Sequence, residues 1–352
     1  MKDIELVYKG EIHRIPNSWE GMTEQQFVSL VTDLLAMAAG KLSAGEVRIN
    51  HLCRIMKWQK RRFRTEEQVA NLVAISEQLT FLFLIQYPDN NEVLENVSKE
   101  TYELCRRVDP FRLNIPIARV LRRLEYQYVV DLCFCAQLIP TISINNRTYH
   151  AYKIQKDYGS LTCSLTALQY IEARSLIEQG EKSLPLIAAI LYYPEKEYSS
   201  EHAHALAKEF EVLPLETLTA ISFNFQAFNS YLFSKTAFSL LTKFKLKPEH
   251  PITTDASDAL YDLSKDGLGD SRQIEQMNLL TYLKVLRKKT IDAVRDMKGF
   301  GWYKEINLED IVEIIYNKVQ NGEKKSEAIK NTAKEFGINK KEVYSLYHEK
   351  YD

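Results

Sequence analysis

The sequence predicts a mainly helical protein with two small β-hairpins, an α+β fold by strict naming. Apolar residues recur every three or four positions along most of the chain, which is typical of amphipathic helices. Two short stretches, residues 3–16 and 141–154, instead alternate apolar and polar residues on both sides of a turn, which predicts hairpins. A chain of 352 residues suits two or three domains. We expect lobes at 1–139 and 140–250, a linker at 251–270 and a helical tail at 271–352.

The two hairpins open a longer pattern that occurs twice. Each copy has a two-residue turn followed by a Thr-x-x-Gln sequence. In the first copy the turn is Lys9-Gly10 and the sequence runs from Thr23 to Gln26. In the second copy the turn is Asn145-Asn146 and the sequence runs from Thr166 to Gln169. Asn and Gly tolerate the positive φ of tight hairpin turns, and the Thr and Gln spacing is that of a helix capping box. Either the lobes are duplicated, or each uses a common local structure independently.

Composition sets limits on function. The chain has 46 Lys and Arg against 47 Asp and Glu, so no overall charge attracts nucleic acid or anionic lipid. No apolar run reaches the roughly 20 residues of a membrane-spanning helix, and the N-terminus enters a strand pattern without a signal peptide. Five cysteines within apolar helical patterns predict reduced thiols and an intracellular location. We expect no membrane partner.

The remainder of the first lobe reads as helices around a basic stretch. We predict helices over 44–58, from Thr65 to Ile85 and from Tyr126 to Leu138, with arginines between 105 and 124 that pair with acids or form a basic face. The basic stretch contains Lys57, Lys60, Arg61, Arg62 and Arg64. It can bind a phosphate backbone with Trp58 and Phe63 stacking on bases, or it can be a solvated loop neutralised by Glu66 and Glu67.

The second lobe contains a predicted helix at 199–210 and an aromatic helix at 223–244. Phe228, Tyr231 and Phe238 share a stripe on the aromatic helix, which indicates either core or a partner-binding surface. A further long helix is predicted over 271–297.

Residues 308–352 form the most specific local pattern, three short helices. The spacing of Ala333, Gly337, Ile338 and Val343 is what two helices crossing through a tight turn require, and Asn339 is predicted to cap the third helix. The segment 321–348, and most closely 326–344, resembles the helix-turn-helix-like C-terminal tail of the 16S rRNA ribose 2′-O-methyltransferase family. No glycine-rich loop of a methyltransferase body precedes it, so the resemblance implies the tail's shape and not the activity. As a DNA-binding module it would expose Lys340, Lys341, Ser345 and His348 on its third helix. With seven Lys against six acids in residues 321–352, it can equally be a docking module for a protein partner.

A second resemblance concerns the N-terminal unit. Residues 15–19 (Ile-Pro-Asn-Ser-Trp) and 22–27 (Met-Thr-Glu-Gln-Gln-Phe) loosely resemble tail-assembly or virion-associated proteins of phages that infect gut bacteria. The resemblance implies a structural protein located in the virion or the host cytoplasm, with other virion or assembly proteins as partners.

No Walker loop, Gly-x-Ser-x-Gly, His-Glu-x-x-His or Cys-x-x-Cys motif occurs. We therefore expect no catalytic residues, metal ligands or cofactor. The leading hypothesis is a non-enzymatic assembly or structural protein of a phage or mobile element. The alternative is a nucleic-acid-binding protein that uses the tail and the basic stretch, and an enzyme with a spatially assembled site ranks third.

Overall fold

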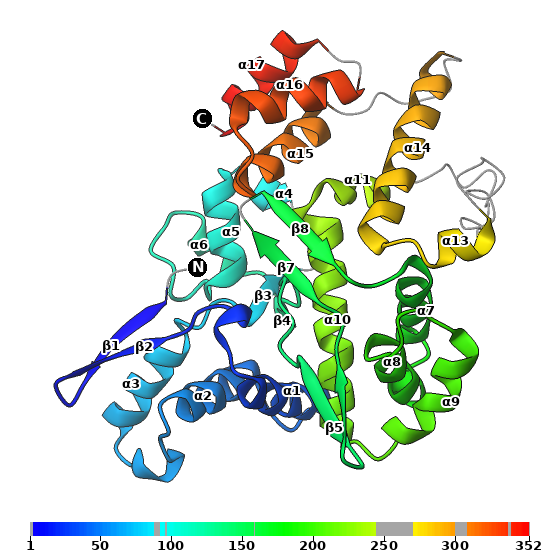
Figure 1. Ribbon diagram of the computed structural model, residues 1–352. Helices are drawn as coiled ribbons and strands as arrows, with labels where there is room; N and C mark the ends of the chain where they lie inside the picture. Colours follow the sequence, from blue (N-terminus) through cyan, green and yellow to red (C-terminus); the bar gives the residue numbers. More distant parts are fainter. Residues whose placement is uncertain are drawn as a thin grey trace. The chain divides into compact units, whose positions relative to one another are not determined.

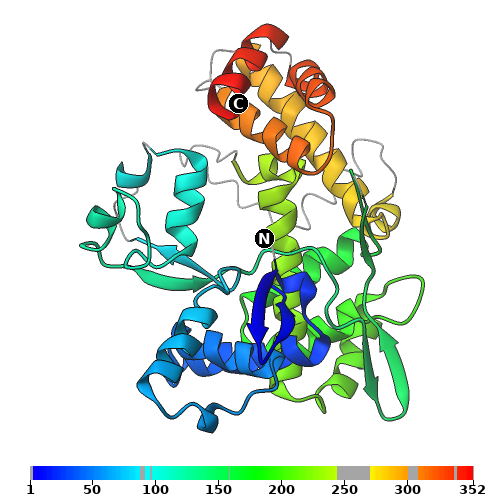
Figure 2. The same cartoon turned by 90° about the vertical axis from the view of Figure 1, so that its left-hand side faces the viewer.

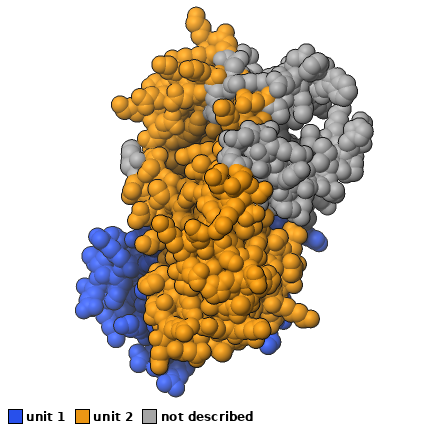
Figure 3. Space-filling view, turned by 45° about the vertical axis from the view of Figure 1, so that its right-hand side comes forward, with its two compact units in different colours: residues 1–132, 215–220 blue, residues 133–214, 221–352 orange. Residues whose placement is uncertain are grey.

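A computed structural model describes residues 3–87, 92–95, 97–157, 159–243, 270–299, 308–336 and 339–351. It confirms the predicted fold class, because these residues are mainly helical with small two-stranded antiparallel sheets (Figure 1). The chain divides into two compact units, coloured separately in Figure 3. Unit 1 comprises Met1–Leu132 and Leu215–Ala220, and unit 2 comprises Cys133–Pro214 and Ile221–Asp352. The linker predicted at 251–270 lies outside the described residues except for Asp270.

Unit 1 begins with the first predicted hairpin. Lys9 and Gly10 both have positive φ, 53° and 80°, and place Val7 opposite Ile12. The three α-helices that follow start at capping boxes, including the one predicted at Thr23 and one at Thr65, where a helix start was predicted. The elements are β1 (Ile4–Tyr8), β2 (Glu11–Ile15), η1 (Trp19–Gly21), α1 (Glu24–Ala38), α2 (Ala44–Ile55), η2 (Lys60–Arg62) and α3 (Glu66–Ser76).

The core of unit 1 forms around Trp19, which is 3% exposed. Its indole Nε1 donates a hydrogen bond to the main-chain oxygen of Asp131 at 2.8 Å. Its ring meets Phe27 and Phe81 edge to face, with centroids 6.2 and 5.4 Å away. Ile15 and Phe27 are buried as well. The sequence patterns at 15–19 and 22–27 therefore reflect the packing of this core.

Two of the helix predictions in unit 1 are wrong. The helix expected from Thr65 to Ile85 ends at Ser76, and Phe83–Gln86 forms strand β3. The helix expected from Tyr126 to Leu138 is replaced by strand β4 (Gln127–Val130), which pairs antiparallel with β3. Aromatic and β-branched residues favour strands once a partner strand is available, but that partner lies some forty residues away and gives no local signal.

Three short helices join these strands: α4 (Glu92–Glu95), α5 (Lys99–Arg107) and α6 (Ala118–Leu121). They form a second apolar cluster on β3, made of Ile85, Tyr87, Leu94, Cys105, Leu113, Ala118 and Leu121. Arg119, Arg122 and Arg123 do not share one long helix, because α6 ends at Leu121. Arg122 instead donates hydrogen bonds to the main-chain oxygens of Pro110 and Leu113.

Unit 2 begins with the second predicted hairpin, whose turn residues Asn145 and Asn146 have φ of 48° and 63°. A further hairpin that the sequence did not predict separates it from the capping box at Thr166 and Gln169. The elements are β5 (Thr141–Ile144), β6 (Arg147–His150), β7 (Ile154–Asp157), β8 (Ser160–Cys163), α7 (Ala167–Ile177), η3 (Glu181–Ser183), α8 (Leu184–Leu191), α9 (Ser200–Phe210), α10 (Leu215–Lys235, which begins in unit 1), η4 (Ala237–Ser239) and α11 (Leu240–Lys243).

The helix predicted over 271–297 is interrupted. It forms α13 (Ser271–Glu275) and α14 (Leu279–Gly299), because the residues around the break bond to the segment where α7 begins. The main-chain N–H of Ala167 donates to the oxygen of Met277 at 2.8 Å, and that of Leu279 donates to the oxygen of Leu165 at 2.9 Å. These tertiary bonds replace the helical ones.

The tail forms the predicted helices α15 (Leu308–Gln320), α16 (Lys325–Phe336) and α17 (Lys340–Tyr351). They enclose a core together with α14, beside which they lie in Figure 2, and the core includes Ile291, Ile311, Ile315, Ala328, Ile329, Ala333, Phe336, Val343 and Tyr347. The predicted cap at Asn339 is present, since its side-chain oxygen accepts from the Lys341 N–H at 3.0 Å. Gly337 and Ile338, predicted at the turn, lie outside the described residues.

Candidate functional site

The basic stretch predicted at 57–64 surrounds the short helix η2 on the surface of unit 1. Its five cationic side chains are exposed, and no carboxylate of the described residues lies within 4.0 Å of them: Lys57, Lys60, Arg61, Arg62 and Arg64. The Trp58 ring packs 4.9 Å from Tyr8 and 5.6 Å from Phe63. The stretch is therefore positively charged, but its aromatic rings are engaged with each other and with the hairpin.

The tail residues proposed for nucleic acid lie on α17. Lys340, Lys341 and Ser345 are exposed, and the Ser345 hydroxyl donates to the main-chain oxygen of Lys341 at 3.1 Å. His348 is half-buried, with its ring 4.3 Å from that of Tyr344. The two lysines thus lie at the start of α17, and Ser345 lies near its middle.

The aromatic stripe lies inside unit 2. Phe228 is fully buried, and Tyr231 and Phe238 are each 8% exposed. The Tyr231 hydroxyl donates to the Asn321 side-chain oxygen at 3.3 Å, which ties α10 to the turn after α15. In unit 2 these side chains present little surface to a partner and serve as core.

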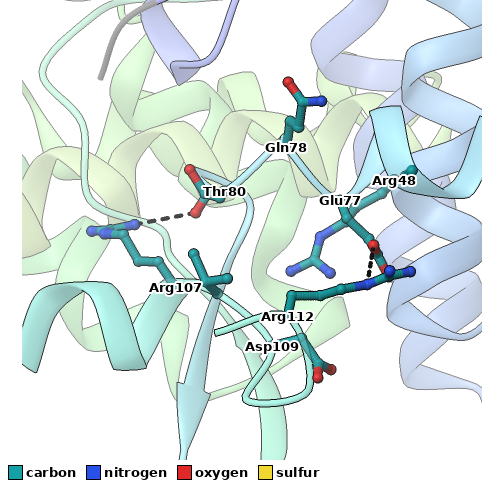
Figure 4. Close-up of a pocket in the computed structure, with 9 residues that line it drawn as sticks. Arg48, Glu77, Gln78, Thr80, Arg107, Asp109 and Arg112 are labelled. Carbon is teal, nitrogen blue, oxygen red and sulfur yellow. Dashed lines mark hydrogen bonds and ion pairs between the residues drawn. The ribbon is translucent and has the colours of Figure 1, made fainter. Parts of the chain in front are cut away.

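Unit 1 also contains a pocket of about 420 Å³ that the sequence did not reveal. It lies between α2, the C-terminal ends of α3 and α5, and the segments that follow the latter two helices (Figure 4). Its walls are Arg48, Ala74, Glu77, Gln78, Thr80, Arg107, Val108, Asp109 and Arg112. Three arginines line this pocket, and arginine is the residue that most often binds carboxylates and phosphates.

Two of the arginines have carboxylate partners in the protein. Arg107 Nη1 lies 2.9 Å from the Asp131 carboxylate, and its Nε lies 3.5 Å from that of Glu103. Arg112 Nε lies 2.9 Å from the Glu77 carboxylate. Figure 4 shows the Arg112–Glu77 pair on one side of the pocket and Arg107, bonded to the Thr80 oxygen, on the other.

Arg48 differs from both, because it is only 5% exposed and has no such partner. Its guanidinium carbon lies 5.1 Å from the centre of the Phe83 ring and 4.8 Å from that of Tyr128, which are cation–π distances. Its Nε is buried without a hydrogen-bond partner. The signal that could have drawn attention to it is a lone arginine among the apolar positions of α2.

Asp109 anchors the floor of the pocket. Its carboxylate accepts hydrogen bonds from the hydroxyls of Tyr128 at 2.7 Å and Tyr126 at 3.0 Å, and from the Phe111 N–H at 2.9 Å. Burial, with this carboxylate, raises the pKa of Tyr126 to about 12. The tyrosines therefore remain neutral donors, and Asp109 is already satisfied without Arg48.

In the described part of the chain, no group of three or more His, Cys, Asp or Glu side chains is arranged to hold a metal ion. Among the same residues, no helix is both long and apolar enough to cross a membrane. Comparisons of the chain with protein-family models, with curated proteins and with solved structures gave no match.

Proposed function

We propose that the protein is a non-enzymatic assembly or structural protein that acts through protein–protein contacts. The observation that carries the proposal is the outer face of the N-terminal hairpin. Val7 and Ile12 lie directly opposite each other and are 70% and 68% exposed. Adjacent exposed aliphatic side chains on a short hairpin are a recognised feature of contact surfaces.

The opposite face of the hairpin is anchored in unit 1. Tyr8 packs on Trp58 and Ile15 is fully buried, so the hairpin is held in place. On the outer face, the neighbouring pair is Glu5 and Arg14, with 3.4 Å between the carboxylate and Nε. An apolar centre with a charged neighbour is the usual composition of a protein interface.

The biological context that we propose is a phage or related mobile element, with other virion or assembly proteins as partners and the virion or host cytoplasm as location. It rests on the resemblance of residues 15–19 and 22–27. Both segments belong to the core and capped helix of unit 1.

Nucleic-acid binding is the second candidate, and the exposed basic stretch favours it. Its five cations lack carboxylate partners within 4.0 Å among the described residues, and Lys340 and Lys341 are exposed on α17. Such binding would weaken steeply with salt, because cations that neutralise phosphates release counterions.

Three variants separate the two candidates. V7D/I12D places charges on the outer face of the hairpin, K60A/R61A/R62A removes three cations of the basic stretch, and V212D is the matched control. Val212 is 65% exposed on unit 2, so V212D introduces the same change at a surface outside the proposed contact. Each tagged protein is used to capture partners from its native source, with half of each sample treated with nuclease.

The assembly proposal predicts partners that persist after nuclease, are lost with V7D/I12D and remain with V212D. Partners that disappear with nuclease and with K60A/R61A/R62A, while V7D/I12D retains them, would establish the nucleic-acid alternative in its place. Circular dichroism verifies that each variant is folded.

A further inference from the structure

Arg48 brings an unbalanced positive charge into the interior of unit 1. Its side chain is on α2, the residue is 5% exposed, and no carboxylate of the described residues lies within 4.0 Å. Arginine does not release its proton in proteins, so burial cannot neutralise it. Buried charges are ordinarily paired, because an unpaired one costs several kcal/mol. An anionic ligand would compensate this charge.

The other cations of the pocket do not need one. Arg107 is paired with Asp131 and Glu103, and Arg112 is paired with Glu77. Asp109 accepts three hydrogen bonds from other groups. Within the described residues that line this pocket, Arg48 is the cation whose charge is available to a ligand.

The orientation of Arg48 suits that role. The Phe83 and Tyr128 rings pack against its guanidinium, 5.1 and 4.8 Å from the carbon, and the Tyr128 hydroxyl beside it is neutral, so neither residue balances its charge. Figure 4 shows the guanidinium extending into the middle of the pocket between Arg107 and the Glu77–Arg112 pair. A planar fork of N–H groups matches the two oxygens of a carboxylate.

The remaining walls restrict the ligand. Glu77 and Asp109 would repel a second negative charge, while Ala74 and Val108 supply apolar surface. A volume of about 420 Å³ is in the range of small-molecule sites. We propose that this pocket binds a small aliphatic monocarboxylate, with its carboxylate on Arg48 and its chain against Ala74 and Val108. This site is independent of the contact surface proposed for the hairpin.

The test is titration calorimetry of the full chain with sodium butyrate, replacing sodium chloride at constant ionic strength. Sodium sulfate is the probe for a doubly charged anion, and 1-butanol is the probe for the chain without the charge. Butyrate should bind, 1-butanol should not, and sulfate should bind more weakly than butyrate. R48M should weaken butyrate binding by about tenfold or more, since a charged hydrogen bond contributes roughly 1.5–3 kcal/mol.

R64M is the matched control, because Arg64 is exposed, carries the same charge and does not line the pocket. It should bind butyrate as the unmodified protein does. A second variant, A74F, leaves Arg48 in place and fills the pocket from an exposed position on α3, so it tests the site if R48M does not fold. It should abolish binding.

Failure of the unmodified protein to bind butyrate overturns the proposal, and so does binding that both R48M and A74F retain. Tighter binding of sulfate than of butyrate would overturn the assignment to a monocarboxylate.

Discussion

His51 provides the sharpest test of the energetics of unit 1. The residue is fully buried on α2, and neither ring nitrogen has a hydrogen-bond partner. Burial, helped by the Arg54 charge, lowers its pKa from 6.5 to about 4, against a smaller opposing effect of Asp33. A folded-state pKa below the unfolded value means that the unfolded chain binds more protons, so stability is lost as pH falls from 6.5 towards 4.

The size of the effect follows from the shift. The full difference in the pKa of His51, from 6.5 to about 4, corresponds to a loss of about 3 kcal/mol in the free energy of unfolding, and this loss is complete below pH 4. Between pH 7.5 and pH 5.0 the loss is about 2 kcal/mol, because His51 of the unfolded chain is then largely protonated and that of the folded chain is not. H51L removes the titrating group and both unpaired nitrogens, and it has a similar volume.

The assay is urea unfolding at pH 7.5 and pH 5.0, followed by tryptophan fluorescence. Trp19 reports on the surroundings of His51, since both rings pack on Phe81. We expect H51L to equal or exceed the unmodified protein at pH 7.5, and to lose about 2 kcal/mol less on going to pH 5.0. H204L is the control, because it removes an exposed histidine of α9 and leaves His51 in place.

Equal pH dependence in H51L and the unmodified protein would refute the argument from desolvation. A loss of several kcal/mol in H51L at pH 7.5 would show instead that the imidazole nitrogens have partners in the folded protein.

Three further perturbations test the packing. D33N removes the charge of Asp33, whose carboxylate accepts two hydrogen bonds from the Arg54 guanidinium at 2.6 and 2.9 Å. It should lower the free energy of unfolding in urea by about 2 kcal/mol, which is less than for a fully buried pair because the Arg54 side chain is 34% exposed. D33E retains the charge and should cost less, and equal losses in the two variants would contradict a role for the charge. T23A removes a capping bond of α1 and should cost about 1 kcal/mol in the same assay, with T23S near neutral as its control. I315A opens a cavity in the tail core and should cost about 3 kcal/mol, seen as faster amide exchange in α15 to α17; unchanged exchange there would show that the tail core does not hold these helices.

Local signals predicted much of the fold. The capping boxes at Thr23, Thr65 and Thr166, and the Asn145-Asn146 turn, appear where expected. Each depends on hydrogen bonds or backbone angles within about four residues, so the information lies in one short stretch.

The failures share a cause. Strands β3 and β4 were predicted as helices, because their pairing joins Phe83 to Val130 across 47 positions. The long helix near 271–297 breaks for a similar reason, since Leu165 and Ala167 bond to Leu279 and Met277 at the break between α13 and α14. Bonds between distant segments can replace helical ones without leaving a local trace.

The pocket could not be predicted from the sequence for the same reason. Arg107 and Arg112 were recognised as possible partners of acids, but Arg48 attracted no attention, because its burial depends on Phe83 and Tyr128 from two distant strands. The sequence by itself determined many of the helices, their caps and two hairpin turns, whose stabilising bonds are local. Only the tertiary structure decided which charges are paired and which is left for a ligand, because electrostatic balance in a protein interior depends on neighbours that the order of residues does not bring together.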